Sequence, residues 1–193
     1  MALLAEELVE EWLRRQGYFT IRGIKLGVHE IDLLAVRWRS GQDAECRHLE
    51  VQASMRPVSF ISRVPKDLQR SGRAANSARR SAEELSLGVT EWVHTKFKRS
   101  EKVELMKKLW NGEWSSELVL NAVHSQEEVE LIEKCGVKVL RLKDIVVSLA
   151  QNRGPVASAS GADFVDLIHM GAAAKPLAAP AAPQPDSPAS ASR

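Results

Sequence analysis

His48-Leu49-Glu50-Val51-Gln52-Ala53-Ser54 is a short apolar run that carries polar side chains at alternate positions. In a strand, residues two apart point to the same face, so Glu50 and Gln52 would share one face and the apolar residues between them the other. A carboxylate in a partly buried strand must be paired, hydrogen-bonded or bound to a metal, because burying it bare is costly or shifts its pKa. The stretch therefore predicts a core strand in which Glu50 has a partner.

A second strand is expected just before this one. Residues 29–36 are mostly apolar, and the polar, glycine-containing turn at 40–44 would fold them back as a hairpin onto residues 46–53. A suitable register brings Asp32 opposite Glu50. Like charges opposed in a sheet repel, and a divalent cation between the two carboxylates relieves that repulsion. Hard oxygen ligands suit Mg²⁺ or Mn²⁺, so the hairpin predicts such an ion held by Asp32 and Glu50.

The remaining elements are predicted from hydrophobic spacing, caps and turn residues. They are a helix over 3–16 ended by Gly17, a strand over 18–21, a weak helix over 66–85, a strand or loop over 88–97 and a helix over 100–110 capped by Ser100. A strand over 118–123, a helix opened by Ser125 in capping-box fashion and closed by Gly136, and a strand over 137–142 would form a right-handed parallel crossover, with a last helix over 145–149. The expected fold class is α/β, with a mixed central sheet flanked by helices.

Composition places these elements in one domain over residues 1–150. The 193 residues are 44% hydrophobic and 27% charged, and the net charge of +2 favours no class of partner. No run approaches the roughly 20 apolar residues that cross a bilayer, and the acidic N-terminal region does not resemble a signal peptide. Cys46 and Cys135 lack disulfide or zinc spacing. We therefore expect a cytoplasmic protein without membrane contact.

Residues 151–193 form a second region, rich in Ala, Pro and Ser, which is typical of a flexible tail. One segment differs. Residues 163–170 (Asp-Phe-Val-Asp-Leu-Ile-His-Met) have the pattern of two amphipathic turns around Phe164. We expect this segment to dock either on the domain or on a protein partner.

The order of these features resembles the PD-(D/E)XK nuclease superfamily, most nearly its resolvase-like and restriction-endonuclease-like branches. The resemblance rests on a helix glutamate before a Gly-Tyr pair, a Glu-x-Asp-Leu-Leu strand and an apolar-Glu-x-Gln strand, and it extends over roughly residues 3–150 apart from the middle. It implies a restriction-endonuclease-like core with Glu6, Asp32, Glu50 and Gln52 as site residues. Glu7 is the alternate to Glu6.

The same resemblance implies a role for each residue. Asp32 and Glu50 would be the metal ligands, Glu6 would complete the site, and Gln52 would orient the attacking water. Most members carry lysine where this chain has Gln52. Glutamine can hold a water molecule but brings no charge. Whether the chain is an active enzyme or an inactive relative therefore depends on residue 52. His48 shares the face of Glu50, and we interpret it as structural.

Basic residues gather directly after the proposed catalytic strand. Between Arg56 and Arg80 there are seven basic residues and a single acid. Such a run is commonly a solvated face; here we interpret it as a surface that contacts phosphates without reading sequence. The residues expected to bind nucleic acid are Arg56, Arg63, Lys66, Arg70 and Arg73.

Three functions are compatible with the sequence. The first is a metal-dependent nuclease that hydrolyses phosphodiester bonds of DNA. The second is a nuclease-like fold with weak or no catalysis, which serves as a DNA-binding or protein-interaction module. The third is a structural subunit without nucleic-acid contact. A homodimer that cuts both strands and a monomer are both compatible with the sequence.

Overall fold

The computed structural model describes residues 2–38, 44–54, 59–151, 163 and 166–170. Its centre is a five-stranded sheet in the order β1-β2-β3-β4-β5. The strands are β1 (Phe19–Leu26), β2 (His29–Arg37), β3 (Glu45–Gln52), β4 (Trp114–Leu120) and β5 (Val137–Arg141). β2 is antiparallel to both of its neighbours, β1 and β3, whereas β3, β4 and β5 are mutually parallel. The predicted α/β fold with a mixed sheet is confirmed.

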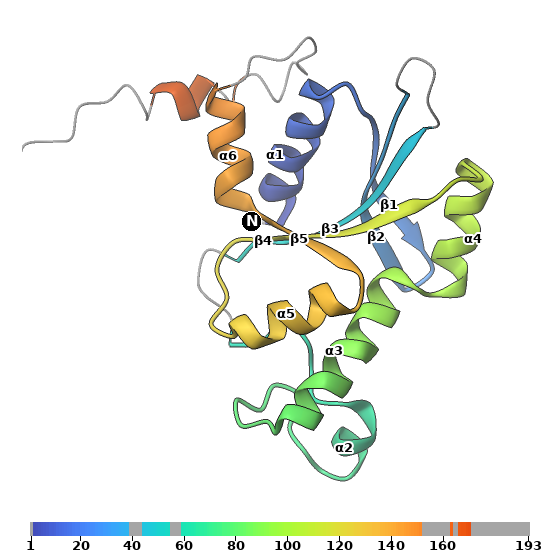
Figure 1. The fold of residues 1–193 in the computed structure, drawn as a ribbon, viewed down its shortest axis with the longest axis vertical. Coiled ribbons are helices and arrows are strands. Elements are labelled where there is room, and N and C mark those ends of the chain that lie inside the picture. The colour runs from blue at the N-terminus through green and yellow to red at the C-terminus, as the bar shows by residue number, and fades with distance from the viewer. Residues whose placement is uncertain (1, 39–43, 55–58, 152–162, 164–165, 171–193) are drawn as a thin grey trace, which may run out of the picture.

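Helices cover both faces of this sheet (Figure 1). α1 (Ala2–Arg15) and α6 (Leu142–Gln151) lie on one face, and α3 (Ala82–Phe97) and α5 (Gln126–Lys134) lie on the other. The alternation of β3 explains this arrangement, because Leu49 and Val51 belong to the core under α1 and α6. Glu50, between them, points to the face that α3 covers.

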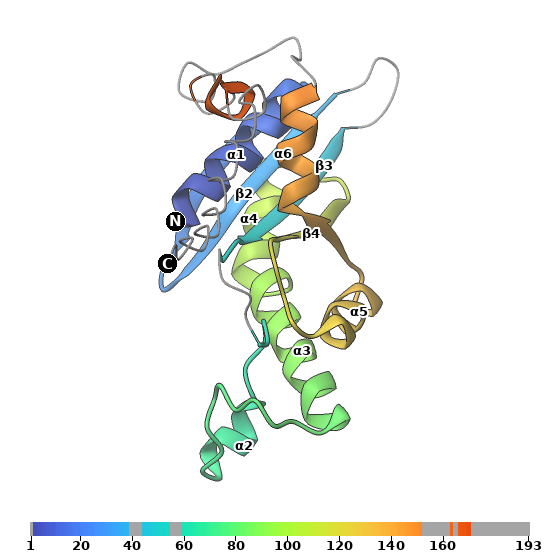
Figure 2. The same ribbon diagram turned by 90° about the vertical axis from the view of Figure 1, so that its left-hand side faces the viewer.

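Two further helices belong to the long connection between β3 and β4. α2 (Lys66–Arg70) is short and lies at the end of α3 that is remote from the sheet, as Figure 2 also shows. α4 (Ser100–Leu109) follows α3 and packs Met106 against Ile31 and Leu34 of β2. The connection starts at the end of β3 and returns to its neighbour β4, and side chains of α3 and α4 contact Glu50 of β3.

Helix α3 is where the sequence-based prediction was wrong. The structure has one helix over 82–97 instead of a strand or loop over 88–97, and only the short α2 within the first half of the predicted helix over 66–85. Ser81 begins α3 with a capping box, since its hydroxyl accepts the Glu84 N–H while the Glu84 carboxylate accepts the Ser81 N–H. The β-branched and aromatic residues of this segment favour a strand, but its buried residues recur every four positions.

Other boundaries differ by smaller amounts. The strand expected over 18–21 extends to Leu26, and the last helix begins at Leu142. Arg99, not Ser100, is the N-cap of α4. Ser125 caps α5 by accepting the N–H of Glu128. The Glu128 carboxylate is used elsewhere, because it accepts the N–H groups of the segment at 61–62 at 2.7 and 2.8 Å.

The tail is described only in part. Phe164 lies outside the described residues, whereas residues 166–170 form a helical turn near the end of α6. His169 Nε2 lies 3.0 Å from the carbonyl oxygen of Ala150, so this segment contacts the domain. No helix in the described ranges is long and apolar enough to cross a membrane.

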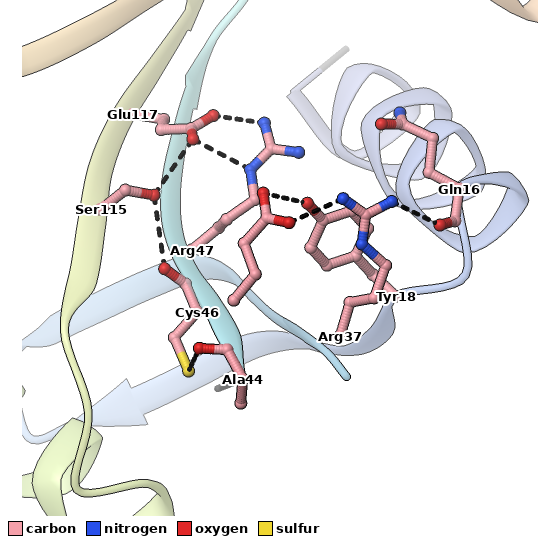
Figure 3. Close-up of polar contacts among 9 residues, drawn as sticks. Gln16, Tyr18, Arg37, Ala44, Cys46, Arg47, Ser115 and Glu117 are labelled. Atoms are coloured by element: carbon pink, nitrogen blue, oxygen red, sulfur yellow. Dashed lines mark hydrogen bonds and ion pairs between the residues drawn. The ribbon is translucent and has the colours of Figure 1, made fainter. Parts of the chain in front are cut away.

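A buried ion pair joins β3 to β4 (Figure 3). Its Arg47 is three residues from Glu50 along β3, so the two side chains point to opposite faces of the sheet. Arg47 donates two hydrogen bonds to Glu117, one of them at 2.9 Å from Nε to Oε1, and Ser115 donates to the same carboxylate at 3.1 Å. The guanidinium also lies over the Tyr18 ring, 5.2 Å from its centroid. These contacts fix the parallel register in which Glu50 lies beside Leu118 of β4.

The segment at 61–66 approaches α3 closely at Gly88. A Cβ at this position would lie 2.5 Å from the carbonyl oxygen of Arg63. Alanine gains about 1 kcal/mol over glycine in a helix interior, but overpacking costs about 1–3 kcal/mol. We expect Gly88→Ala to lower the thermal midpoint, measured by circular dichroism. Ser86→Ala, at an exposed position of the same helix, should leave the midpoint unchanged or raise it, and an equal rise in both variants would contradict the close approach.

Candidate functional site

Glu50 is buried in the middle of the sheet, with 1% of its surface exposed. Its Oε2 accepts a hydrogen bond from Lys96 Nζ at 2.7 Å, and its Oε1 accepts one from Lys102 Nζ at 2.6 Å. His48 Nε2 lies 3.2 Å from Oε1. The prediction that Glu50 has a partner is confirmed, but the two lysines were not predicted, and Asp32 was the expected neighbour.

The two lysines differ in their access to solvent. The Lys102 side chain is 1% exposed, and its ammonium also donates to the carbonyl oxygen of Lys96 at 2.8 Å. It thereby ties α4 to the end of α3. The Lys96 side chain is 38% exposed, so its ammonium is both paired with Glu50 and reachable from outside.

These contacts keep Glu50 charged. Burial alone would raise the pKa of Glu50, but the hydrogen bond from His48 and the two ammonium groups outweigh it and lower the pKa to about 2. Burial also lowers the pKa of His48, so the neutral imidazole donates its Nε2–H to the carboxylate. His48 packs against Phe97, with ring centroids 5.0 Å apart, which agrees with its interpretation as a structural residue.

Asp32 lies next to Glu50, as the hairpin predicted. The β2–β3 ladder pairs Leu33 with Leu49, and the next residues in this register are Asp32 and Glu50. Asp32 Oδ2 accepts the backbone N–H of Val51 at 2.8 Å. Burial and the charge of Glu50 raise the pKa of Asp32 to about 6, against the opposing effect of the Val51 hydrogen bond.

Glu6, on α1, interacts electrostatically with the same two carboxylates. Burial raises its pKa, Arg22 opposes this, and the nearby charge of Glu50 adds to the rise. Glu7 instead forms an ion pair with Arg22 at 3.3 Å. Glu6 is therefore the α1 glutamate that shares the electrostatic environment of Asp32. Within the described ranges, no three or more His, Cys, Asp or Glu side chains are grouped so as to hold a metal ion.

Gln52 lies at the exposed end of β3 and opens onto a cavity of about 430 Å³. The cavity lies between β3, α3 and the segment at 61–69. Its lining includes Gln52, Arg63, Lys66, Glu91, Trp92 and Lys96. The ammonium of Lys96 thus stands between the buried carboxylate and this cavity, on the side where residue 52 lies.

The residues expected to bind nucleic acid occupy different places. Arg63 and Lys66 line the cavity. Arg70 and Arg73 form ion pairs with neighbouring carboxylates on the surface. Arg56 lies outside the described residues. Of the four that lie within the described residues, Arg63 and Lys66 are the two that share the cavity lining with Gln52 and Lys96.

The sequence contained a partial signal for the two lysines. Once 82–97 is recognised as a helix, Lys96 falls beside Phe97 on the edge of the buried stripe. Lys102 lies four residues before Met106, and both are the buried residues of α4. A lysine on an apolar stripe of a helix needs a buried acid, but the spacing does not identify Glu50 as that acid.

The comparisons with known proteins name no family. No protein-family model matches the chain, and no curated protein matches it. Among solved structures, the crystal structure of a protein of unknown function, AF1548, is similar, with a TM-score of 0.41 and 14% sequence identity. The match covers 74% of this chain and 64% of the other chain, so the chain spans less than two thirds of that protein's length.

Asp32→Asn should stabilise the fold at neutral pH. The raised pKa means that the folded state disfavours the charged Asp32 carboxylate. Charged Asp32 therefore lowers the free energy of unfolding above about pH 6. This loss shrinks as the pH falls from about 6 to 3.8, the pKa of an aspartate in the unfolded chain. We expect Asp32→Asn to gain up to about 3 kcal/mol at pH 8 and nothing at pH 3.5, measured by urea unfolding. The exposed Asp144→Asn is the control, and a pH-independent gain for Asp32→Asn would contradict this account.

Lys102→Met should destabilise the fold strongly. It leaves the buried Glu50 with one ammonium fewer, and breaking a buried pair from one side costs about 3–5 kcal/mol. Urea unfolding measures the loss, and Lys107→Met, at an exposed position of α4, should have little effect. Replacing Glu50 with Met as well should recover part of the loss, because no uncompensated carboxylate remains. If Lys102→Met were as stable as the control, the ion pair between Lys102 and Glu50 would contribute little to the free energy of unfolding.

Proposed function

We propose that the chain is a metal-dependent nuclease that hydrolyses phosphodiester bonds of DNA, with a restriction-endonuclease-like core. One observation carries the proposal: the ammonium of Lys96 lies 2.7 Å from Glu50, beside Asp32 and at the mouth of the cavity that Gln52 lines. A positive charge next to two carboxylates is the feature that Gln52 could not supply. In this chain α3 provides it from outside the strand.

Each side chain then has a role in the proposed reaction. Lys96 would stabilise the negative charge that builds up on the phosphate, since a preorganised cation in a partly buried site acts strongly there. Gln52 would hold the attacking water through its amide. Lys102, which is fully buried against Glu50, would act as a positioning residue by fixing the carboxylate.

The donor set is compatible with Mg²⁺ or Mn²⁺. Mg²⁺ is usually held by one or two carboxylates together with waters and substrate phosphates, so Asp32 and Glu50 suffice in number. The raised pKa of Asp32 beside Glu50 is the response expected of two carboxylates that a cation would stabilise. Bound there, the ion would lower the pKa of a water and offset charge on the phosphate.

A second candidate is a nuclease-like fold that binds DNA without cutting it. The specific observation in its favour is that both oxygens of Glu50 already accept hydrogen bonds from ammonium groups. Those bonds compete with a metal ion for the same lone pairs. In this case binding persists without divalent ions and falls steeply as salt is raised.

Cleavage of labelled DNA in Mg²⁺ or Mn²⁺ tests the proposal. Lys96→Met should reduce the rate by about 10²-fold or more, as loss of one electrostatic stabiliser does. Lys98→Met, two residues along and exposed, is the matched control. Adding Gln52→Lys to Lys96→Met should restore part of the rate, because the charge returns to the cavity from β3. If DNA stayed intact at high protein and Mn²⁺ concentrations, the nuclease proposal would be rejected and the DNA-binding fold without cleavage would remain.

A further inference from the structure

The walls of the cavity beside Lys96 are held in place by buried polar contacts. The Glu128 carboxylate, fully buried, accepts hydrogen bonds from the N–H groups of Ile61 and Ser62 and, at 2.5 Å, from the Ser62 hydroxyl. Arg80 donates to the carbonyl oxygen of Ser62 at 3.1 Å. Together with the close approach at Gly88, these contacts fix the segment that carries Arg63 and Lys66 against α3.

The lining combines an aromatic ring with cations. Trp92 is partly buried and packs edge-on against Phe97, with ring centroids 6.0 Å apart, which limits the motion of the indole. Arg63 and Lys66 are exposed at the rim. Glu91 accepts the backbone N–H of Lys66 at 3.1 Å, and among the described residues of the lining it is the one acid. An aromatic surface beside several cations is the chemistry that binds a nucleobase and its phosphate.

We propose that this cavity binds one unpaired nucleotide of a DNA strand, with the base against Trp92 and the adjoining phosphate near Lys96 and Lys66. A volume of about 430 Å³ lies in the range of small-molecule sites. A paired base stays in its stack and cannot enter, so the cavity selects single-stranded DNA or an extruded nucleotide over intact duplex. The inference rests on the proposed function for its substrate, and it names the form of DNA that the site prefers.

The experiment measures binding without catalysis. A fluorescein-labelled DNA strand of about 12 nucleotides, and the same sequence as a blunt duplex, are titrated with the full chain in EDTA by fluorescence anisotropy. The wild type should bind the single strand more tightly. Trp92→Leu should weaken single-strand binding by about fivefold or more, since it removes base stacking. Trp92→Phe should retain most of the affinity, and Trp38→Leu, at an exposed ring (53%) outside the cavity lining, should retain all of it.

A second pair of variants covers the case in which Trp92→Leu fails to fold. Arg63→Gln combined with Lys66→Gln changes only exposed rim residues and should weaken single-strand binding and flatten its salt dependence. Lys143→Gln, exposed on α6, is the control.

Several results would overturn the inference. They are equal affinity for strand and duplex, no effect of the rim variants, or a free nucleoside monophosphate binding as tightly as the strand. Because EDTA removes the divalent ions, a positive binding result with no cleavage in Mn²⁺ would reject the nuclease and keep this site.

Discussion

The burial of the Glu50 carboxylate is the constraint around which the structure is built. An isolated charge in the interior is strongly disfavoured, and here two ammonium groups from different helices compensate it. The same contacts join β3 to α3 and α4, which otherwise belong to a long connection outside the sheet. With Asp32 nearby, two carboxylates face two lysines, so the local charge is close to balanced while the pKa of Glu50 stays near 2 and that of Asp32 rises to about 6.

The two lysines differ in burial and therefore in what their ammonium groups can contact. Lys102 is enclosed and bonded to two acceptors, so it holds geometry. Lys96 makes its ion pair from the wall of an open cavity. Electrostatic stabilisation depends on where a charge lies relative to the reacting group and not on which strand or helix carries it. A glutamine at residue 52 is therefore compatible with a charged site, provided that α3 delivers its lysine to the same place.

Local patterns predicted the hairpin and most of the elements, because strand alternation, turn residues and caps act over a few residues. They also allowed a register that places Asp32 opposite Glu50, and the observed pairing of Leu33 with Leu49 has this register. Local patterns could not predict the contacts of the two lysines with Glu50, because Lys96 and Lys102 lie 46 and 52 residues from Glu50 in the chain. The same is true of Glu128, whose position matched a helix cap but whose carboxylate binds a segment 66 residues away.

Buried ion pairs are weak evidence for stability, because apolar residues of similar volume often do as well or better. The ion pairs of Glu50 with its lysines are therefore better understood through what they position. The same holds for the buried Glu128 carboxylate, which accepts hydrogen bonds from the segment at 61–62. The Glu50 contacts hold an ammonium beside Asp32, near the end of the central strand β3. The Glu128 contacts hold the basic rim of Arg63 and Lys66 against α3. Because both sets converge on a single cavity, the polar interior fixes the relative positions of carboxylates, cations and the Trp92 ring, which an apolar core would leave unspecified.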